Sequence, residues 1–172
     1  MRLLQRNPGS ILWLRSEINI VIENLQFQAK ARNIDPDRLI FAKKVDMAAH
    51  LARHQKADLF LDTFAYNAHA TALDALWAGL PVLTMQGNSF PSRVGASVLT
   101  AAGIPELITT SEHEYESKAQ WLVDHPDELR RLKHRLIKNR LECSLFDTEQ
   151  TTRHLEKIYR ECWQKSTGFN SQ

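Results

Sequence analysis

The stretch ADLFLDTFAYNAHATALDALWAGLPVLTM, residues 57–85, decides the fold that this sequence predicts. The apolar run over 57–63 has the length of a strand and enough apolar residues to be buried on both faces. A helix is predicted over 69–79; it ends at Gly79, a favourable residue after a helix, and Pro81 follows. A second strand is expected over 81–85. Strand, helix and strand in this order predict a βαβ unit of a parallel sheet.

The same alternation continues on both sides of this unit. Strands are expected over 10–15, 38–43 and 105–109, and helices over 17–33, over 46–56 with Asp46 as N-cap, and within 86–103. Further helices are expected over 113–124, 127–141 and 147–165, and the tail 166–172 is expected to fray.

These elements predict an α/β fold, a Rossmann-like parallel sheet with helices on both faces, followed by a helical C-terminal appendix. We expect the whole chain, 1–172, to form a single domain. Its sheet core would cover about 10–110 and its C-terminal helices about 113–165.

Composition excludes several classes of function. The net charge is +2, with 22 basic and 20 acidic residues interspersed, so a nucleic-acid partner is not expected. No apolar run reaches the roughly 18 to 20 residues of a membrane span, and the N-terminus lacks the features of a signal peptide. The two cysteines, Cys143 and Cys162, lie outside any metal-ligand spacing. We expect a cytoplasmic protein with neither a membrane partner nor a metal site.

The start of the helix at 69–79 suits an anion. In parallel sheets, ligands bind beyond the carboxyl ends of strands, beside helix N-termini that carry a partial positive charge. His69 and Thr71 would add donors there, small neighbours would let a phosphate approach the backbone, and Asp74 could accept from a sugar hydroxyl. The alternative is a helix that Asn67 merely caps. The residues alone leave both interpretations open.

A second group lies on the helix at 46–56. His50 and Arg53 are three residues apart, so they share a face and could hold a base or a phosphate. The residues alone favour the alternative, a solvated basic face that includes His54 and Lys56.

A third group is NSFPSRVGAS, residues 88–97. Ser89 or Ser92 is expected to cap the helix that follows. Arg93 would then stand in its first turn, where a cation opposes the helix dipole, and a salt bridge is the favoured explanation.

Four short patterns follow one another in this chain: LDT at 61–63, N-x-H-x-T-x-x-D at 67–74, LWAG-x-P-x-x-T at 76–84 and SRV-x-AS at 92–97. In this order they resemble the C-terminal catalytic lobe of the protein O-linked N-acetylglucosamine transferases, including bacterial members with TPR repeats. The resemblance extends from SILWLR to SLFDTEQTTRHLEKIY and covers effectively the whole chain. It implies a GT-B enzyme, in which two Rossmann-like lobes face each other and the C-terminal lobe holds the nucleotide sugar.

The resemblance also implies the chemistry. The donor would be UDP-N-acetylglucosamine, the acceptor a protein Ser or Thr hydroxyl, and no metal or other cofactor would be required. His69 and Thr71 would be the catalytic residues, which stabilise the leaving diphosphate, and Asp74 would hold ribose hydroxyls. His50 and Arg53 would lie around the uracil. The full set of implied nucleotide-sugar-binding residues is Val45, Met47, His50, Arg53, Asn67, His69, Ala70, Thr71 and Asp74.

Two of these residues depart from the family pattern. Met47 replaces a lysine that reaches the ribose, and methionine cannot donate a hydrogen bond. Ala70 stands where threonine is frequent, which removes a phosphate contact. We therefore expect a change in nucleotide affinity or identity.

The resemblance places a phosphate-binding lysine, the acceptor-facing lobe with the general base, and the TPR repeats before the matched region. MRLLQRNPG would then be the end of a longer helix in an N-terminally truncated lobe that lacks one or more strands. We expect the chain alone to be inactive, to bind UDP weakly, and to self-associate through a bare sheet edge. The alternatives are a non-catalytic remnant or interaction module, and a sugar-nucleotide epimerase or hydrolase of the same architecture.

Overall fold

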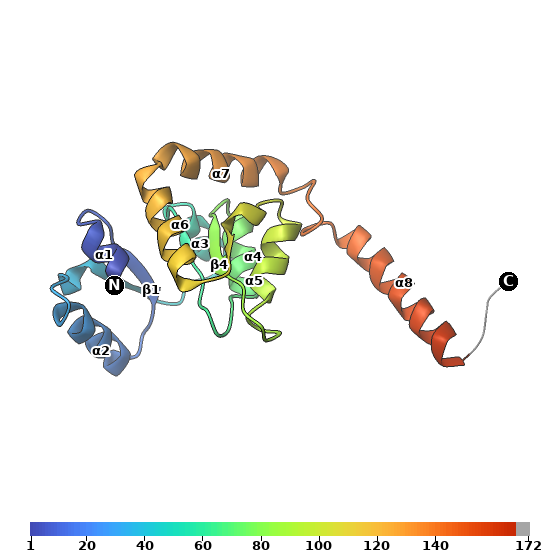
Figure 1. Ribbon diagram of the computed structural model, residues 1–172, viewed down its shortest axis with the longest axis horizontal. Coiled ribbons are helices and arrows are strands. Elements are labelled where there is room, and N and C mark those ends of the chain that lie inside the picture. The colour runs from blue at the N-terminus through green and yellow to red at the C-terminus, as the bar shows by residue number, and fades with distance from the viewer. Residues whose placement is uncertain (168–172) are drawn as a thin grey trace.

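Helices and parallel strands alternate along the chain, as the sequence predicts (Figure 1). The computed structural model describes residues 1–167, so most of the tail 166–172, expected to fray, lies outside the described residues. The elements are α1 (Arg2–Arg6), β1 (Leu12–Arg15), α2 (Asn19–Lys30), a 3₁₀ helix η1 (Pro36–Arg38), β2 (Leu39–Ala42), α3 (Met47–His54), β3 (Phe60–Leu61), α4 (Ala70–Trp77), β4 (Val82–Met85), α5 (Val94–Ala101), a 3₁₀ helix η2 (Pro105–Leu107), β5 (Ile108–Thr109), α6 (Glu112–Asp124), α7 (Pro126–Asn139) and α8 (Thr148–Thr167). The α/β class is confirmed. Among residues 1–167, no helix combines the length and the apolar character that a membrane span requires.

The larger core surrounds a sheet with the strand order β3-β4-β5, in which all neighbours are parallel. Apolar side chains of α4, α5, α6 and α7 meet those of β4 there. Leu76, Val82, Leu83, Leu99 and Leu122 are completely buried. Each fully buried side chain of this kind contributes about 1.5 to 3 kcal/mol relative to an exposed one, so this core stabilises the part of the chain that carries the site.

A second, smaller sheet joins β1 and β2 in parallel, with Leu12 opposite Leu39 and Leu14 opposite Phe41. One face packs on α1 and α2 through a cluster that includes Leu4, Ala29 and Leu39. The other face is open, and the side chains of Trp13 and Ile40 are 37% and 41% exposed.

The expected sheet is therefore present as two parallel sheets, because no β-ladder joins β1 to β3 among the described residues. Helix α1 connects the two parts. Arg2 and Arg6 pair with Glu116 of α6 at 2.5 and 3.0 Å, and the side chains of Asn7 and Gln120 exchange two hydrogen bonds of 2.9 and 3.0 Å. The single domain over 1–172 stays a prediction.

Two expected helix boundaries are confirmed by their geometry. Asp46 caps α3, since its Oδ1 accepts from the amide of Ala49 at 3.0 Å. Gly79 follows α4 with a φ of +84°, in the left-handed region that side chains disfavour.

Two other expectations are wrong. Ser89 and Ser92 do not cap α5; their side chains bond to each other at 2.9 Å, and Arg93 occupies the N-cap position without a side-chain bond. The strand expected over 57–63 is shorter and less buried, because only Phe60 and Leu61 pair with β4 and Leu61 is 37% exposed.

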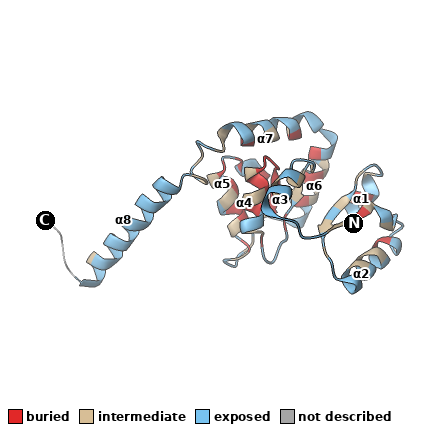
Figure 2. Cartoon of the chain, turned by 180° about the vertical axis from the view of Figure 1, so that it is seen from behind, coloured by how far each residue is buried: buried red, intermediate tan, exposed pale blue. Residues whose placement is uncertain are grey.

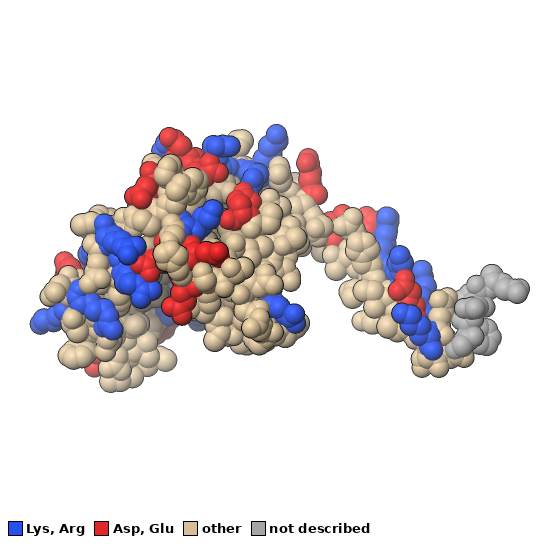
Figure 3. Space-filling model, viewed as in Figure 1, with Lys and Arg blue, Asp and Glu red and all other residues tan. Residues whose placement is uncertain are grey.

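The C-terminal helices differ in their packing. Leu129, Leu132 and Leu136 of α7 are buried in the larger core, whereas α8 has no buried residue and projects away from the body (Figures 1 and 2). Its apolar residues lie on one face and are exposed: Leu155, Ile158, Tyr159, Cys162 and Trp163. Charges of both signs lie side by side over α7 and along α8 (Figure 3).

Arg38 ties α1 to the smaller sheet. Its guanidinium donates to the backbone oxygens of Leu4, Asn7 and Ser10 at 2.8, 2.7 and 2.8 Å. We expect Arg38→Leu to destabilise this region by about 2 to 4 kcal/mol, because several hydrogen bonds of a charged donor are lost together. Hydrogen exchange of the β1 and β2 amides measures this loss.

Arg32→Leu is the matched control, since Arg32 follows α2 and its guanidinium donates to the carbonyl oxygen of Gln28 in the last turn of that helix. Equal destabilisation by both variants would contradict the role given to Arg38.

Candidate functional site

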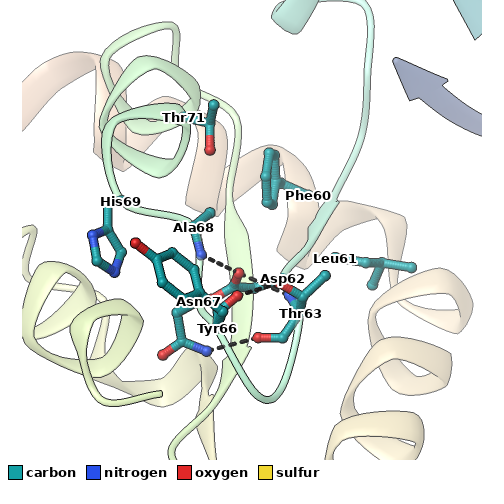
Figure 4. A pocket seen from close by; sticks show the side chains of 9 residues that line it. All are labelled: Phe60, Leu61, Asp62, Thr63, Tyr66, Asn67, Ala68, His69 and Thr71. Atoms are coloured by element: carbon teal, nitrogen blue, oxygen red, sulfur yellow. Dashed lines mark hydrogen bonds between the residues drawn. The ribbon is translucent and has the colours of Figure 1, made fainter. Parts of the chain in front are cut away.

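A pocket of about 350 Å³ opens where β3 ends, at the loop that leads into α4 (Figure 4). Its lining residues are Phe60, Leu61, Asp62, Thr63, Tyr66, Asn67, Ala68, His69 and Thr71. This is the carboxyl end of a parallel strand beside a helix N-terminus, where such sheets bind their ligands. The pocket brings together three of the predicted site residues, namely Asn67, His69 and Thr71.

The carboxylate of Asp62 organises the loop, and its side chain is only 4% exposed. Oδ1 accepts from the amides of Thr63 and Ala68 at 2.8 and 2.7 Å, and Oδ2 accepts from the Thr84 hydroxyl at 2.7 Å. A buried carboxylate persists only when it is hydrogen-bonded in this way. It closes the loop onto β4 and sets the entry of α4. Asp62 lies in the pattern LDT, but no role for it is predicted from the sequence. A carboxylate at the end of an apolar strand is the feature that could have identified it.

The backbone of Asp62 is held as well. The Tyr115 hydroxyl of α6 donates to its carbonyl oxygen at 3.0 Å. Burial, and to a smaller extent the Asp62 carboxylate, raises the pKa of Tyr115 well above its usual value. The phenol therefore stays protonated and keeps donating throughout the physiological range.

Asn67 caps a helix, but a different one from the helix expected. It is fully buried, its Nδ2 donates to the carbonyl of Thr63 at 2.7 Å, and its Oδ1 accepts from the amide of Gly95 in α5 at 3.1 Å. Both the amide nitrogen and the amide oxygen of this side chain are thus hydrogen-bonded, one to the loop after β3 and the other to α5. Asn67 as the cap of the helix at 69–79 is wrong, because its only side-chain acceptor faces α5.

Gly95 is where α5 approaches the pocket floor. A Cβ at this position would lie 2.4 Å from the Thr84 hydroxyl oxygen and 2.7 Å from Asp62 Oδ2. Only glycine lets α5 approach the buried hydrogen bond between these two side chains so closely.

His69 takes the N-cap position of α4, but its side chain makes no capping hydrogen bond. Its imidazole stacks on the ring of Tyr66, with centroids 4.9 Å apart and an interplanar angle of 16°. Its Nε2 is buried and has no hydrogen-bond partner within residues 1–167. An α-helix leaves its first amides without intrahelical partners, so α4 presents donors at the same place. The arrangement can accept an anion; the diphosphate role of His69 and Thr71 stays a prediction.

A second cluster joins α3 to α4. His50 Nε2 lies 3.6 Å from Asp74 Oδ2. Nη2 of Arg53 lies 2.6 Å from His50 Nδ1, and its Nη1 donates to the carbonyl oxygen of Lys43 at 2.9 Å. Because a guanidinium can only donate, His50 Nδ1 accepts and its proton lies on Nε2, facing Asp74. The structure thus brings together the three residues predicted to hold base and ribose.

Burial lowers the pKa of His50, and the neighbouring His54 and Arg53 lower it further. The Asp74 carboxylate opposes this shift. His50 is therefore a neutral donor and acceptor at neutral pH.

The remaining predicted residues are solvent-exposed. Val45 and Met47 are 42% and 62% exposed at the start of α3, and Ala70 is exposed in the first turn of α4. Arg93 makes no ion pair within residues 1–167, so the expected salt bridge is wrong for the described chain. Its exposed guanidinium can stay in water without a partner.

Parallel strands, with a pocket at the end of one strand beside a helix N-terminus, define a Rossmann-like α/β lobe. The family model of glycosyl transferase family 41 matches residues 1–155. This chain belongs to that family.

Two curated relatives are similar over almost the whole chain. The UDP-N-acetylglucosamine–peptide N-acetylglucosaminyltransferase of Caenorhabditis elegans is 34% identical over 96% of this chain and 14% of its own length. The probable UDP-N-acetylglucosamine–peptide N-acetylglucosaminyltransferase SEC of Arabidopsis thaliana is 35% identical over 94% of this chain and 17% of its length. The chain thus spans about one seventh to one sixth of the length of these relatives.

The fold is also that of a solved bacterial protein. A mutant of the Thermobaculum terrenum O-GlcNAc transferase superposes with a TM-score of 0.89 at 29% identity, over 95% of this chain and 32% of that one. The prediction of a lobe of a protein O-linked N-acetylglucosamine transferase is confirmed at the level of family and fold.

Loss of one Asp62 acceptor should loosen the loop. We expect Asp62→Asn to destabilise the chain by at least about 2 kcal/mol, because an amide has one acceptor oxygen and cannot satisfy all three donors in the buried site. Urea unfolding followed by circular dichroism measures it. Asp58→Asn is the control, since that carboxylate is 82% exposed; a similar loss there would contradict the assignment.

The neighbours of His50 should set its titration. We expect a pKa below 6.5 by NMR, a further decrease in Asp74→Asn and an increase in Arg53→Met, because the carboxylate favours and the guanidinium disfavours the protonated ring. Since the folded-state pKa lies below the unfolded one, the stabilising contribution of the neutral ring is present above pH 6.5 and is lost as the pH falls toward the folded-state pKa. Asp58→Asn should leave the titration unchanged. An increase of the His50 pKa in Asp74→Asn, or a decrease in Arg53→Met, would refute the geometry.

Proposed function

We propose that this chain is the donor-binding part of an inverting glycosyltransferase that moves N-acetylglucosamine from UDP-N-acetylglucosamine to Ser or Thr hydroxyls of proteins. Family membership and the names of the two curated relatives support this proposal.

The observation that carries the proposal is the position of two groups on one helix. His69 and the free amides lie at the start of α4, and Asp74 lies one turn later, in contact with His50 of α3. An anion site and a polar cluster suited to a sugar and a base are thus about 6 to 7.5 Å apart along α4, at a rise of about 1.5 Å per residue. This spacing fits a nucleoside diphosphate, with the phosphates at His69 and Thr71 and the ribose at Asp74.

In the proposed reaction, the acceptor oxygen attacks the anomeric carbon while the bond from that carbon to the diphosphate oxygen breaks. The electron pair of that bond leaves with UDP, and His69, Thr71 and the first amides of α4 stabilise the charge that develops there. The acceptor hydroxyl gives its proton to a general base, which we assign to none of the pocket residues of this chain. The isolated chain is therefore expected to bind UDP weakly and to be inactive, with Met47 lowering its affinity further.

Calorimetry of the 172-residue chain with UDP, uridine and GDP tests this assignment. His69→Ala and Thr71→Ala should each weaken UDP binding by about tenfold, because each removes a donor to a charged group. Uridine binding should not change, since it lacks the phosphates. His113→Ala, which is exposed in the first turn of α6 and is not among the residues that line the pocket, is the control.

The other outcomes decide against the proposal. No binding of UDP would favour a non-catalytic interaction module, and preference for GDP would assign a different donor. Sugar transfer to a peptide by the purified chain would contradict the absence of a base among its pocket residues.

A further inference from the structure

Tyr66 differs from most residues that line the pocket, because its large aromatic side chain is 64% exposed. An aromatic ring exposed to this extent adds little to a hydrophobic core. Within residues 1–167, its ring contact is with the imidazole of His69, on which it stacks with centroids 4.9 Å apart (Figure 4). Stacked rings at such a separation attract each other beyond the apolar area that they share. The ring of Tyr66 therefore acts on His69 and not on the core.

The backbone at Tyr66 is fixed on both sides. The Thr63 hydroxyl donates to the carbonyl oxygen of Tyr66 at 2.5 Å, and the amide of Asn67 donates to the carbonyl oxygen of Pro91 at 3.0 Å. Because the side chain starts from an anchored Cα, only a few staggered positions are open to its ring. The position that the ring takes is the one stacked on His69.

His69 depends on this contact for its orientation. It occupies the N-cap position of α4 without a capping hydrogen bond, and neither of its ring nitrogens has a hydrogen-bond partner in the part of the chain that the structure describes. A side chain without hydrogen bonds keeps its torsional freedom unless packing removes it. Here the two rings lie nearly parallel, at an interplanar angle of 16°. Tyr66 thus sets the plane of the imidazole and the direction of each nitrogen.

The two ring nitrogens of His69 differ in their access. Nε2 is buried, whereas Nδ1 is not. A ligand can therefore reach Nδ1 without any rearrangement of the loop. A neutral imidazole carries its single proton on one of the two nitrogens, and only the protonated nitrogen donates. The tautomer that suits an anion in this orientation has its proton on Nδ1.

We propose that Tyr66 is a positioning residue of the site: its ring holds the imidazole of His69 so that Nδ1 donates to a phosphate oxygen of the nucleoside diphosphate. This inference rests on the proposed function, which supplies the diphosphate. It goes further by assigning the orientation and the tautomer of His69 to a neighbouring side chain. Tyr66 acts through His69 and makes no contact of its own with the ligand.

NMR of the free 172-residue chain tests the positioning without any ligand. At about pH 8, above the range in which histidine usually titrates, long-range proton–nitrogen spectra should show the proton of His69 on Nδ1. The ring current of Tyr66 should shift the imidazole carbon-bound protons upfield. Tyr66→Phe should keep this shift and Tyr66→Leu should lose it. Tyr159→Leu is the matched control, because Tyr159 of α8 is similarly exposed, at 68%. A proton on Nε2, or an unchanged shift in Tyr66→Leu, would overturn the proposal.

Titration of the same samples with UDP tests the consequence for binding. Tyr66→Leu should weaken UDP binding about fivefold and leave uridine binding unchanged, whereas Tyr66→Phe should bind UDP like the unaltered chain. In the His69→Ala background, Tyr66→Leu should have no further effect, because Tyr66 acts through the imidazole. An equal loss in both backgrounds would mean that Tyr66 contacts the ligand itself, which would overturn the positioning role.

Failure of the proposed function would look different. If the unaltered chain binds no UDP, the diphosphate role of His69 is wrong, and the role of Tyr66 is wrong with it. If the chain binds UDP but the substitutions at Tyr66 and His69 act independently, the proposed function stands and only the positioning by Tyr66 is overturned.

Discussion

The buried carboxylate of Asp62 is the interaction on which the rest of the site depends. A charge with almost no solvent access needs donors, and the donors here come from the loop at Thr63 and Ala68 and from β4 at Thr84. These bonds turn the chain sharply at the end of β3, so that α4 begins at the pocket with its first amides available. The loop, the helix entry and the approach of α5 are thus consequences of satisfying one desolvated group.

The two turns at the start of α4 carry different polar groups as a result of this arrangement. Its first turn carries His69, which the helix does not use as a cap, whereas the next turn carries Asp74, which lies close to His50. Burial keeps that histidine neutral, and Arg53, which donates to the carbonyl of Lys43, favours the neutral form further. The protein itself therefore fixes the positions of these charges, which lowers the cost of ordering them around a bound ligand.

Periodicity predicted the strands and helices well, because Leu129, Leu132 and Leu136, for example, bury one face at helical spacing. It could not predict which side chains would meet across elements. Asn67 accepts a hydrogen bond from α5, 28 residues later in the chain, and Asp62 accepts one from Thr84, 22 residues later. Contacts across such sequence separations leave no local pattern in the sequence. The location of the pocket followed from the rule for parallel sheets, and the roles of its residues came from family resemblance. The split into two sheets also lay beyond local patterns, since strand neighbours are set by tertiary structure.

Helix α8 has a mechanical consequence. It is anchored at its base, where the ring of Phe146 packs edge to face on Trp77 with centroids 5.0 Å apart, and none of its 20 residues is buried. At 1.5 Å per residue the helix is about 30 Å long, so a rotation of about ten degrees at its base displaces its far end by about 5 Å. The base of α8 adjoins the larger core, against which Leu145 and Phe146 pack. A partner that binds Trp163 would therefore respond to small rotations of α8 about this base.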